Sequence, residues 1–158
     1  ISDETVKQYY EDNKPKFQRP ESFRTRHILA ALFPPDALRK QSISDLQKNR
    51  EYFENMAEQK IDAIIKELKE GADFEKLAKE KSDDEGSRDN GGDLETIYKG
   101  VFDPAFDEAV FKLSPGETSG KVKTRFGFHV IQLIEKFPAD MAPFEKMEKP
   151  IQKYLFLE

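Results

Sequence analysis

Apolar residues recur along this 158-residue chain with two different periods, and each change of period marks the end of an expected element. A spacing of three and four residues is typical of helices that bury one face. It predicts helices over residues 3–13, 45–70, 73 onwards, 104–112 and 144 onwards. Common capping residues support these limits, because Ser2 and Asp73 can act as N-caps and Gly71 can follow a last turn.

Runs rich in β-branched and aromatic residues predict strands over about residues 22–32, 120–124 and 128–135. A further short apolar stretch follows the turn at Gly91-Gly92. Polar segments after Pro34-Pro35 and over residues 82–90 are typical of loops. The middle of the chain therefore reads strand, helix, helix, strand, helix, strand, strand. Because the last two strands are adjacent in sequence and suit antiparallel pairing, the pattern indicates an α+β fold.

Composition narrows the function classes. The chain has 31 acidic and 26 basic residues, and this net charge of −5 disfavours nucleic-acid binding, which needs a basic face. No apolar run approaches the roughly 18 residues of a membrane span. Cysteine is absent, which excludes disulfides and thiolate catalysis. No metal-site spacing such as HExxH occurs, so we expect no metal and no other cofactor.

Two histidines stand out because each opens an apolar run. His27 lies in Arg26-His27-Ile28-Leu29, and His129 lies in Phe126-Gly127-Phe128-His129-Val130-Ile131. Gly91-Gly92-Asp93-Leu94 lies between them. A lone histidine in an apolar strand is more often a satisfied core residue than a catalytic one, but two such residues within ordered motifs favour a shared pocket.

The order of these motifs resembles the parvulin family of peptidyl-prolyl cis-trans isomerases. The resemblance covers about residues 22–136 and includes further matching segments. These are Gly71-Ala72-Asp73-Phe74-Glu75-Lys76-Leu77-Ala78, Ser82-Asp83-Asp84, Phe106 with Ala109 and Phe111, Gly116-Glu117, and Thr124-Arg125 before Phe126. It implies a parvulin-like α+β fold: a small antiparallel or mixed four-stranded sheet surrounded by helices, with an extended first helix and helical N- and C-terminal flanks.

The resemblance also implies which residues form the site. The catalytic group would be His27, Asp84, Thr124 and His129, with the two imidazoles linked to each other and to the threonine. The substrate-binding residues would be Leu94, Phe102, Phe106, Phe111, Phe126 and Phe128. Parvulins use no metal, no organic cofactor and no covalent intermediate.

The implied chemistry is rotation about an X-Pro bond, which faces a barrier of about 18–20 kcal/mol although the two end states differ by only about 0.5–1 kcal/mol. A dry pocket that binds the proline ring, with polar groups around it, would favour the twisted amide over the planar one. A carboxylate at Asp84 would oppose the charge-separated planar form. The histidine pair would set the shape and hydrogen bonding of the pocket rather than transfer a proton.

Three departures from the family pattern change the expectation. Glu95-Thr96-Ile97 stands where relatives carry glycine and an aromatic residue, which alters one edge of the pocket. The stretch over about residues 30–60 is longer than usual. No basic cluster follows the first strand, so we expect catalysis that does not depend on phosphorylation of the substrate.

The flanks resemble the joints between a chaperone region and a parvulin domain in extracytoplasmic foldases. We expect a helical flank and linker over residues 1–20, the isomerase domain over 21–137 with an insertion at about 31–60, and a C-terminal linker and helix over 138–158. The chain begins without Met, so we expect a fragment of a longer protein or a processed product, and the resemblance of the flanks implies the catalytic module of a longer chaperone. We expect unfolded or partly folded polypeptides containing X-Pro as partners. The expected location is extracytoplasmic, in the periplasm or, alternatively, on a cell-surface lipoprotein.

Two other hypotheses remain open from the sequence. The domain could bind aromatic-rich or proline-containing segments with little catalysis, as the altered edge at Glu95 would allow. A purely structural domain, which spaces two chaperone halves or forms a dimer through the long helix, is the third hypothesis. Retention of His27, Asp84 and His129 favours catalysis.

Overall fold

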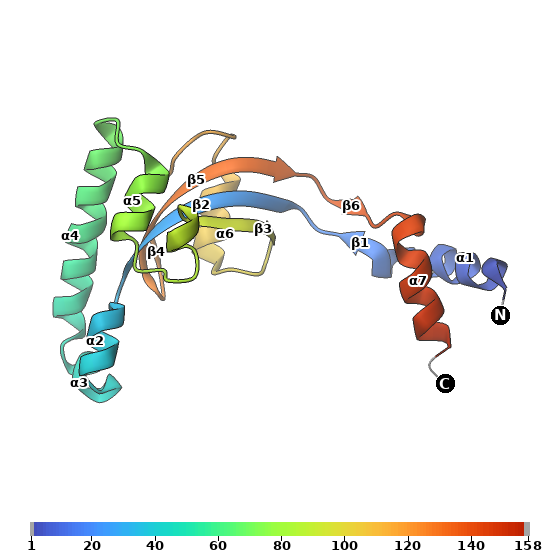
Figure 1. Cartoon of the computed structure of the whole chain (residues 1–158), viewed down its shortest axis with the longest axis horizontal. Coiled ribbons are helices and arrows are strands. Elements are labelled where there is room, and N and C mark those ends of the chain that lie inside the picture. The colour runs from blue at the N-terminus through green and yellow to red at the C-terminus, as the bar shows by residue number, and fades with distance from the viewer. Residues whose placement is uncertain (1, 157–158) are drawn as a thin grey trace. The chain divides into compact units, whose positions relative to one another are not determined.

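A computed structural model describes residues 2–156 of the chain (Figure 1). These residues divide into two compact units. One unit comprises residues 23–136, and the other comprises the described residues on either side of that range. None of the helices within residues 2–156 is both long and apolar enough to cross a membrane.

The larger unit contains a four-stranded sheet in the order β3-β2-β5-β4. Its strands are β2 (Ser22–Ala31), β3 (Asp93–Tyr98), β4 (Val122–Thr124) and β5 (Gly127–Phe137). β4 and β5 pair antiparallel, with Val122 opposite His129. The neighbouring strands β2 and β5 also run in opposite directions (Figure 1). This sheet with its surrounding helices confirms the parvulin-like α+β class.

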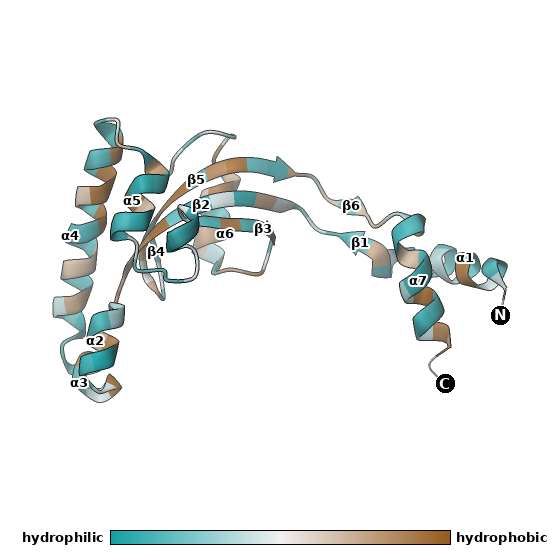
Figure 2. Ribbon diagram, in the orientation of Figure 1, coloured by the Kyte–Doolittle hydropathy of each residue, from teal (hydrophilic) through white to brown (hydrophobic). Residues whose placement is uncertain are grey.

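The helices of the larger unit form two layers because side chains alternate between the faces of each strand. α4 (Arg50–Lys69) and α5 (Phe74–Lys81) cover one face, where Phe128 and Val130 of β5 contribute to the core. α6 (Pro104–Phe111) covers the other face and packs against Ile131 and Leu133. Figure 2 shows hydrophobic residues along β5, in the sheet. It also shows many hydrophilic residues on α4 and α5, the helices that cover one face of that sheet.

The expected helix limits have clear structural causes. The Ser2 side chain accepts a hydrogen bond from the Thr5 amide at 3.3 Å at the start of α1 (Asp3–Asp12). Asp73 caps α5 in the same way, by accepting from the Lys76 amide at 3.1 Å. Gly71 has a φ of +99°, as a residue that ends a helix often does.

The segment before α4 differs from the expectation of a loop followed by one helix over 45–70. The structure contains α2 (Pro35–Lys40) and α3 (Ile43–Lys48), and α4 begins at Arg50. Ser42 caps α3 by accepting from the Asp45 amide at 3.2 Å. Asn49, with φ −110° and ψ 24°, departs from helical geometry and separates α3 from α4.

The smaller unit is built on α1 and α7 (Phe144–Leu155), which share a core of Val6, Tyr10 and Ile151. The Tyr10 hydroxyl donates to the carbonyl oxygen of Ala142 at 2.7 Å. Two short strands that the apolar pattern did not predict, β1 (Gln18–Arg19) and β6 (Asp140–Met141), pair antiparallel. Short 3-10 turns complete the described elements at Lys14–Phe17 and Arg88–Asn90.

Candidate active site

A pocket of about 200 Å³ opens on the face of the sheet that α6 covers. Its wall is mostly apolar. The residues that line it are His27, Leu29, Asp84, Leu94, Phe102, Asp103, Phe106, Thr124, Phe126 and His129. Among residues 2–156, no group of three or more His, Asp or Glu side chains is arranged to hold a metal ion.

The two histidines meet at the centre of the pocket because they lie on neighbouring strands, His27 on β2 and His129 on β5, and point to the same face. Their Nδ1 atoms lie 3.0 Å apart, and their rings stack with centroids 5.2 Å apart. Each residue is only 5% exposed. The pair is therefore shielded from water, and each imidazole must find its polar partners within the protein.

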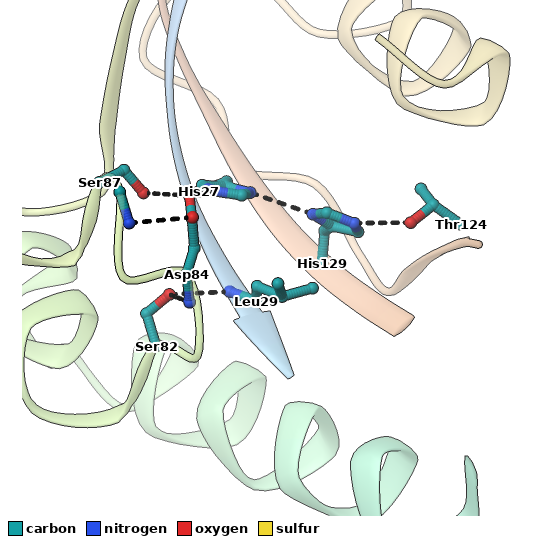
Figure 3. A network of polar contacts seen from close by, with 8 residues as sticks. His27, Leu29, Ser82, Asp84, Ser87, Thr124 and His129 are labelled. Carbon is teal, nitrogen blue, oxygen red and sulfur yellow. Dashed lines mark hydrogen bonds and ion pairs between the residues drawn. The ribbon is translucent and has the colours of Figure 1, made fainter. Parts of the chain in front are cut away.

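Asp84 approaches from the loop between α5 and β3 (Figure 3). Its Oδ2 lies 2.6 Å from Nε2 of His27 and accepts a hydrogen bond of 2.6 Å from the Ser87 hydroxyl. Its Oδ1 accepts from the Gly86 amide at 3.2 Å. The hydrogen bond from His27, followed by that from Ser87, lowers the pKa of Asp84 to about 2 although burial opposes this shift. The carboxylate is therefore ionised at physiological pH.

Thr124, at the end of β4, completes the far end of the same network (Figure 3). Its Oγ1 lies 2.7 Å from Nε2 of His129 and accepts from the Phe126 amide at 3.1 Å. Burial, aided by the neighbouring His27, lowers the pKa of His129 to about 3. His129 is consequently neutral at physiological pH.

Hydrogen-bonding capacity assigns the direction of this network in the state with both imidazoles neutral. An ionised carboxylate only accepts, so Nε2 of His27 carries a proton and donates to Asp84. Nδ1 of His27 then accepts, so the facing Nδ1 of His129 donates. Nε2 of His129 is left to accept from the Thr124 hydroxyl. All four polar groups are satisfied, with every donor pointing towards Asp84.

Aromatic side chains from α6 and the preceding loop form the apolar wall. Phe106 is 2% exposed and contacts His129 edge to face, with ring centroids 5.8 Å apart. Phe102 packs against Phe106 in the same manner at 5.1 Å. Phe126 is 54% exposed and stands at the rim. The wall therefore combines a buried base with an accessible edge.

Two of the residues that the resemblance implied for substrate binding lie outside this pocket. Phe128 neighbours His129 in β5, so strand alternation directs it to the opposite face, where it packs in the core beneath α4 and α5. Phe111 is 66% exposed, because it lies five residues after the buried Phe106, about 140° away around α6. Both placements could have been anticipated from the two periodicities.

Two lining residues were missed by the sequence reasoning. Leu29 lies two positions after His27 in β2, so the alternation that identifies the His27 face also identifies Leu29. Asp103 caps α6 by accepting from the Ala105 amide at 3.0 Å. This hydrogen bond also lowers the pKa of the Asp103 carboxyl. Its place before Pro104 was the available signal, although a cap alone would not have indicated a pocket residue.

The turn before β3 brings Leu94 to the pocket and depends on unusual backbone geometry. Gly92 has a φ of +85°, and a Cβ there would lie 2.3 Å from the carbonyl oxygen of His27. Glu95 also has a positive φ, +61°, and its amide donates to Oδ1 of Asp93 at 2.7 Å. The edge that departs from the family sequence therefore still adopts a conformation that favours glycine.

Comparison with known proteins identifies relatives along most of the chain. The family model of the PPIC-type PPIase domain matches residues 13–137. Foldase protein PrsA of Caldanaerobacter subterraneus subsp. tengcongensis is 35% identical over 155 residues, which cover 98% of this chain and 40% of that protein. Foldase protein PrsA 2 of Listeria monocytogenes serotype 4b is 34% identical over 152 residues, covering 96% of this chain and 41% of that protein.

Solved structures show the same relationship. A crystal structure of the peptidylprolyl isomerase PrsA from Bacillus anthracis matches with a TM-score of 0.56 and 30% identity, over 97% of this chain and 58% of that one. A structure from work on the SurA-like chaperones PEB4 and Cj1289 of Campylobacter jejuni matches with a TM-score of 0.58 and 28% identity, over 98% of this chain and 54% of that one. The chain spans about 40% of the length of these curated relatives.

Proposed function

This chain belongs to the PPIC-type peptidyl-prolyl cis-trans isomerase family, the parvulins, and we propose that its pocket accelerates cis-trans isomerisation of X-Pro bonds in unfolded polypeptides. Similarity to PrsA foldases and SurA-like chaperones assigns it to the foldase branch of the family. The observation that carries the proposal is an apolar pocket joined to one continuous chain of hydrogen-bonded side chains.

The pocket suits the ring of a proline residue. Proline has no N–H that must be satisfied, so an apolar wall such as that of Phe102 and Phe106 can bind its ring without loss of a hydrogen bond. Rotation about the preceding bond costs about 18–20 kcal/mol because twisting removes the amide resonance. A site that binds the twisted amide more tightly than the planar one lowers this barrier.

Asp84 supplies the electrostatic part of this mechanism. In the planar amide, resonance places partial negative charge on the carbonyl oxygen, and this charge decreases as the bond twists. An ionised carboxylate near that oxygen destabilises the planar form relative to the twisted one. Because the pKa of Asp84 is lowered to about 2, the carboxylate keeps its charge at physiological pH. His27, His129 and Thr124 hold it in place through the network.

The lining also supports catalysis that does not require phosphorylation. Of the described residues that line the pocket, two are the carboxylates of Asp84 and Asp103, and none is lysine or arginine. A phosphate group beside these carboxylates would meet like charge without a cation in the lining to balance it. We expect the chain to isomerise a Ser-Pro peptide with a higher kcat/KM than the same peptide carrying phosphoserine before the proline.

Exchange NMR on an X-Pro peptide, with and without catalytic amounts of the chain, tests the proposal directly. We expect faster cis-trans exchange, lost in Asp84→Asn and kept in the matched variant Glu85→Gln. Glu85 is adjacent in sequence, but its side chain is 49% exposed and pairs with Arg39. No acceleration, with peptide resonances shifted by binding, would instead support a binding module with the parvulin fold.

We propose unfolded or partly folded secreted and envelope proteins as the substrates and an extracytoplasmic location, in keeping with the relatives called foldases and SurA-like chaperones. Protease accessibility of the parent protein in intact cells and in spheroplasts would distinguish the cell surface from the periplasm. A dimer formed through the long helix α4 stays a prediction, which sedimentation of the chain would test.

A further inference from the structure

The acidic run at residues 83–85 is more than solvated surface, because each of its three carboxylates pairs with a different basic side chain on a different element. Asp83 pairs with Lys60 of α4 at 2.9 Å, Asp84 with His27 of β2 at 2.6 Å, and Glu85 with Arg39 of α2 at 3.0 Å. The loop that carries Asp84 is thus held on both sides by ion pairs.

The two outer pairs differ in burial, mainly at the carboxylate. The side chains of Asp83 and Lys60 are 13% and 37% exposed, whereas those of Glu85 and Arg39 are 49% and 60% exposed. Exposed pairs contribute little to stability because water screens them. The Lys60–Asp83 pair is therefore the one that can hold the loop.

Asp83 is attached to β2 by its backbone as well as by its side chain. Its amide donates to the Leu29 carbonyl at 2.8 Å, and its Oδ2 accepts from the Ala31 amide at 2.9 Å. Ser82 assists, because its hydroxyl oxygen accepts from the Leu29 amide at 3.1 Å. Together these contacts continue the hydrogen bonding of β2 beyond His27, whose amide donates to the Gly92 carbonyl at 2.9 Å.

We propose that Asp83 is a positioning residue for Asp84, and that Lys60 is required because it neutralises the mostly buried carboxylate that makes this attachment. The inference rests on the proposed isomerase function. Asp83 fixes the backbone one residue before Asp84, whose Oδ2 must stay within hydrogen-bonding distance of Nε2 of His27. Asp83 is attached to β2 through its carboxylate. Without Lys60, this carboxylate would be an unpaired negative charge next in sequence to Asp84.

The charged residues around Asp83 and Asp84 identify Lys60 as the cation that balances Asp83. Asp84 faces His27 from β2, and His129 of β5 and Asp103, the N-cap residue of α6, line the same pocket. On the other side of the loop, Lys60 of α4 is the cation that contacts Asp83. Without its cation, a mostly buried carboxylate is costly to keep away from water. Loss of Lys60 should therefore favour movement of the loop that carries Asp84, without removing any atom from the pocket.

Four variants of the whole chain separate this role from simple anchoring. Lys60→Met leaves the Asp83 charge unpaired, Asp83→Asn removes that charge but keeps an oxygen for the Ala31 amide, and the double variant removes both charges. Arg39→Gln is the matched control, because it breaks the exposed pair on the other side of Asp84. Each is examined for isomerase kcat/KM by exchange NMR and for the resonance of the His27 Nε2 proton.

We expect Lys60→Met to lower kcat/KM by about tenfold, which corresponds to about 1.4 kcal/mol of transition-state stabilisation, and to shift the His27 proton resonance because Asp84 moves relative to His27. The double variant should recover most of the activity, and Arg39→Gln should match the original chain. A double variant no better than Lys60→Met, or a Lys60→Met variant with unchanged kcat/KM, overturns the proposal.

The proton resonance keeps this test separate from the proposed function. If the original chain does not accelerate isomerisation, the proposed function fails. The positioning role then still requires the His27 proton to move in Lys60→Met and to return in the double variant. An unmoved resonance would refute it irrespective of activity.

Discussion

Nδ1 of His27 and Nδ1 of His129 face each other at 3.0 Å, across two strands that pair at the centre of the sheet. Only one of these two atoms carries a proton when both rings are neutral, so the pair has a single direction of donation. Asp84 and Thr124 determine that direction from the two ends. A substitution of Asp84 or of Thr124 should therefore alter the protonation pattern of the imidazole at the opposite end of the network.

Thr124→Val tests the far end of the network. Valine has nearly the same shape but lacks the hydroxyl that donates to Nε2 of His129 and accepts from the Phe126 amide. Leaving buried polar groups unpaired costs about 1–3 kcal/mol. We expect a loss of stability in that range, lower kcat/KM, and an altered pattern of imidazole ¹⁵N shifts.

Thr124→Ser is the matched variant, since it keeps the hydroxyl and removes only a methyl group. It should preserve the ¹⁵N pattern. Identical ¹⁵N spectra of the Val variant and the original chain would show that Thr124 does not set the tautomer of His129.

The stability of the fold should depend on pH through His129. Its pKa is lowered to about 3, whereas an unfolded histidine titrates near 6.5, so the unfolded state takes up the proton first. The stabilising contribution is complete above pH 6.5 and is lost as pH falls towards 3. From this residue alone we expect the free energy of unfolding to fall by about 2 kcal/mol between pH 7 and pH 5.

Urea unfolding at the two pH values measures this change. His129→Asn, which cannot be protonated in this range, should be less stable at pH 7 but should lose about 2 kcal/mol less on acidification. Equal pH dependence in the two proteins would contradict the burial of a neutral His129.

Phe106 and Phe111 form a matched pair within α6. Phe106 is 2% exposed and lines the pocket, whereas Phe111 is 66% exposed and lies outside it. Phe106→Ala should cost about 3–5 kcal/mol of stability and should weaken binding of X-Pro peptides. Phe111→Ala should change neither by much. Peptide titration by NMR, with thermal melts of each variant, checks both expectations, and weaker peptide binding in Phe111→Ala would place the substrate site elsewhere.

Glu95 offers a test of backbone strain at the edge of the pocket. Its φ of +61° disfavours a residue with a Cβ by about 1–2 kcal/mol. Glycine removes this strain, but the greater freedom of the unfolded chain lowers the free energy of unfolding by about 0.5–1 kcal/mol. Glu95→Gly should therefore stabilise the fold by up to about 1.5 kcal/mol. Glu95→Ala retains a Cβ and should give no such gain. A destabilised glycine variant in urea unfolding would mean that the carboxylate itself contributes.

Local signals predicted most of the element limits. Capping by Ser2 and Asp73 predicted two helix starts that the structure contains. The segment over 33–49 was predicted less well, because α2 and α3 have six residues each, which is less than two helical turns and too short for apolar positions to repeat. The strands β1 and β6 have only two residues each, which is too short for an alternating pattern. Their pairing also joins segments that lie far apart in the chain.

The sequence by itself determined the α+β class and the two histidine motifs, because strand and helical spacing are local properties of the chain; the same alternation separates Phe128 from the face of His129, which the expected site did not take into account. Only the tertiary structure decided that Nδ1 of His27 meets Nδ1 of His129, 102 residues away, and that Lys60 neutralises Asp83. Such contacts depend on the register between strands and on the closure of long loops. Those follow from packing of the whole domain, which no local pattern specifies.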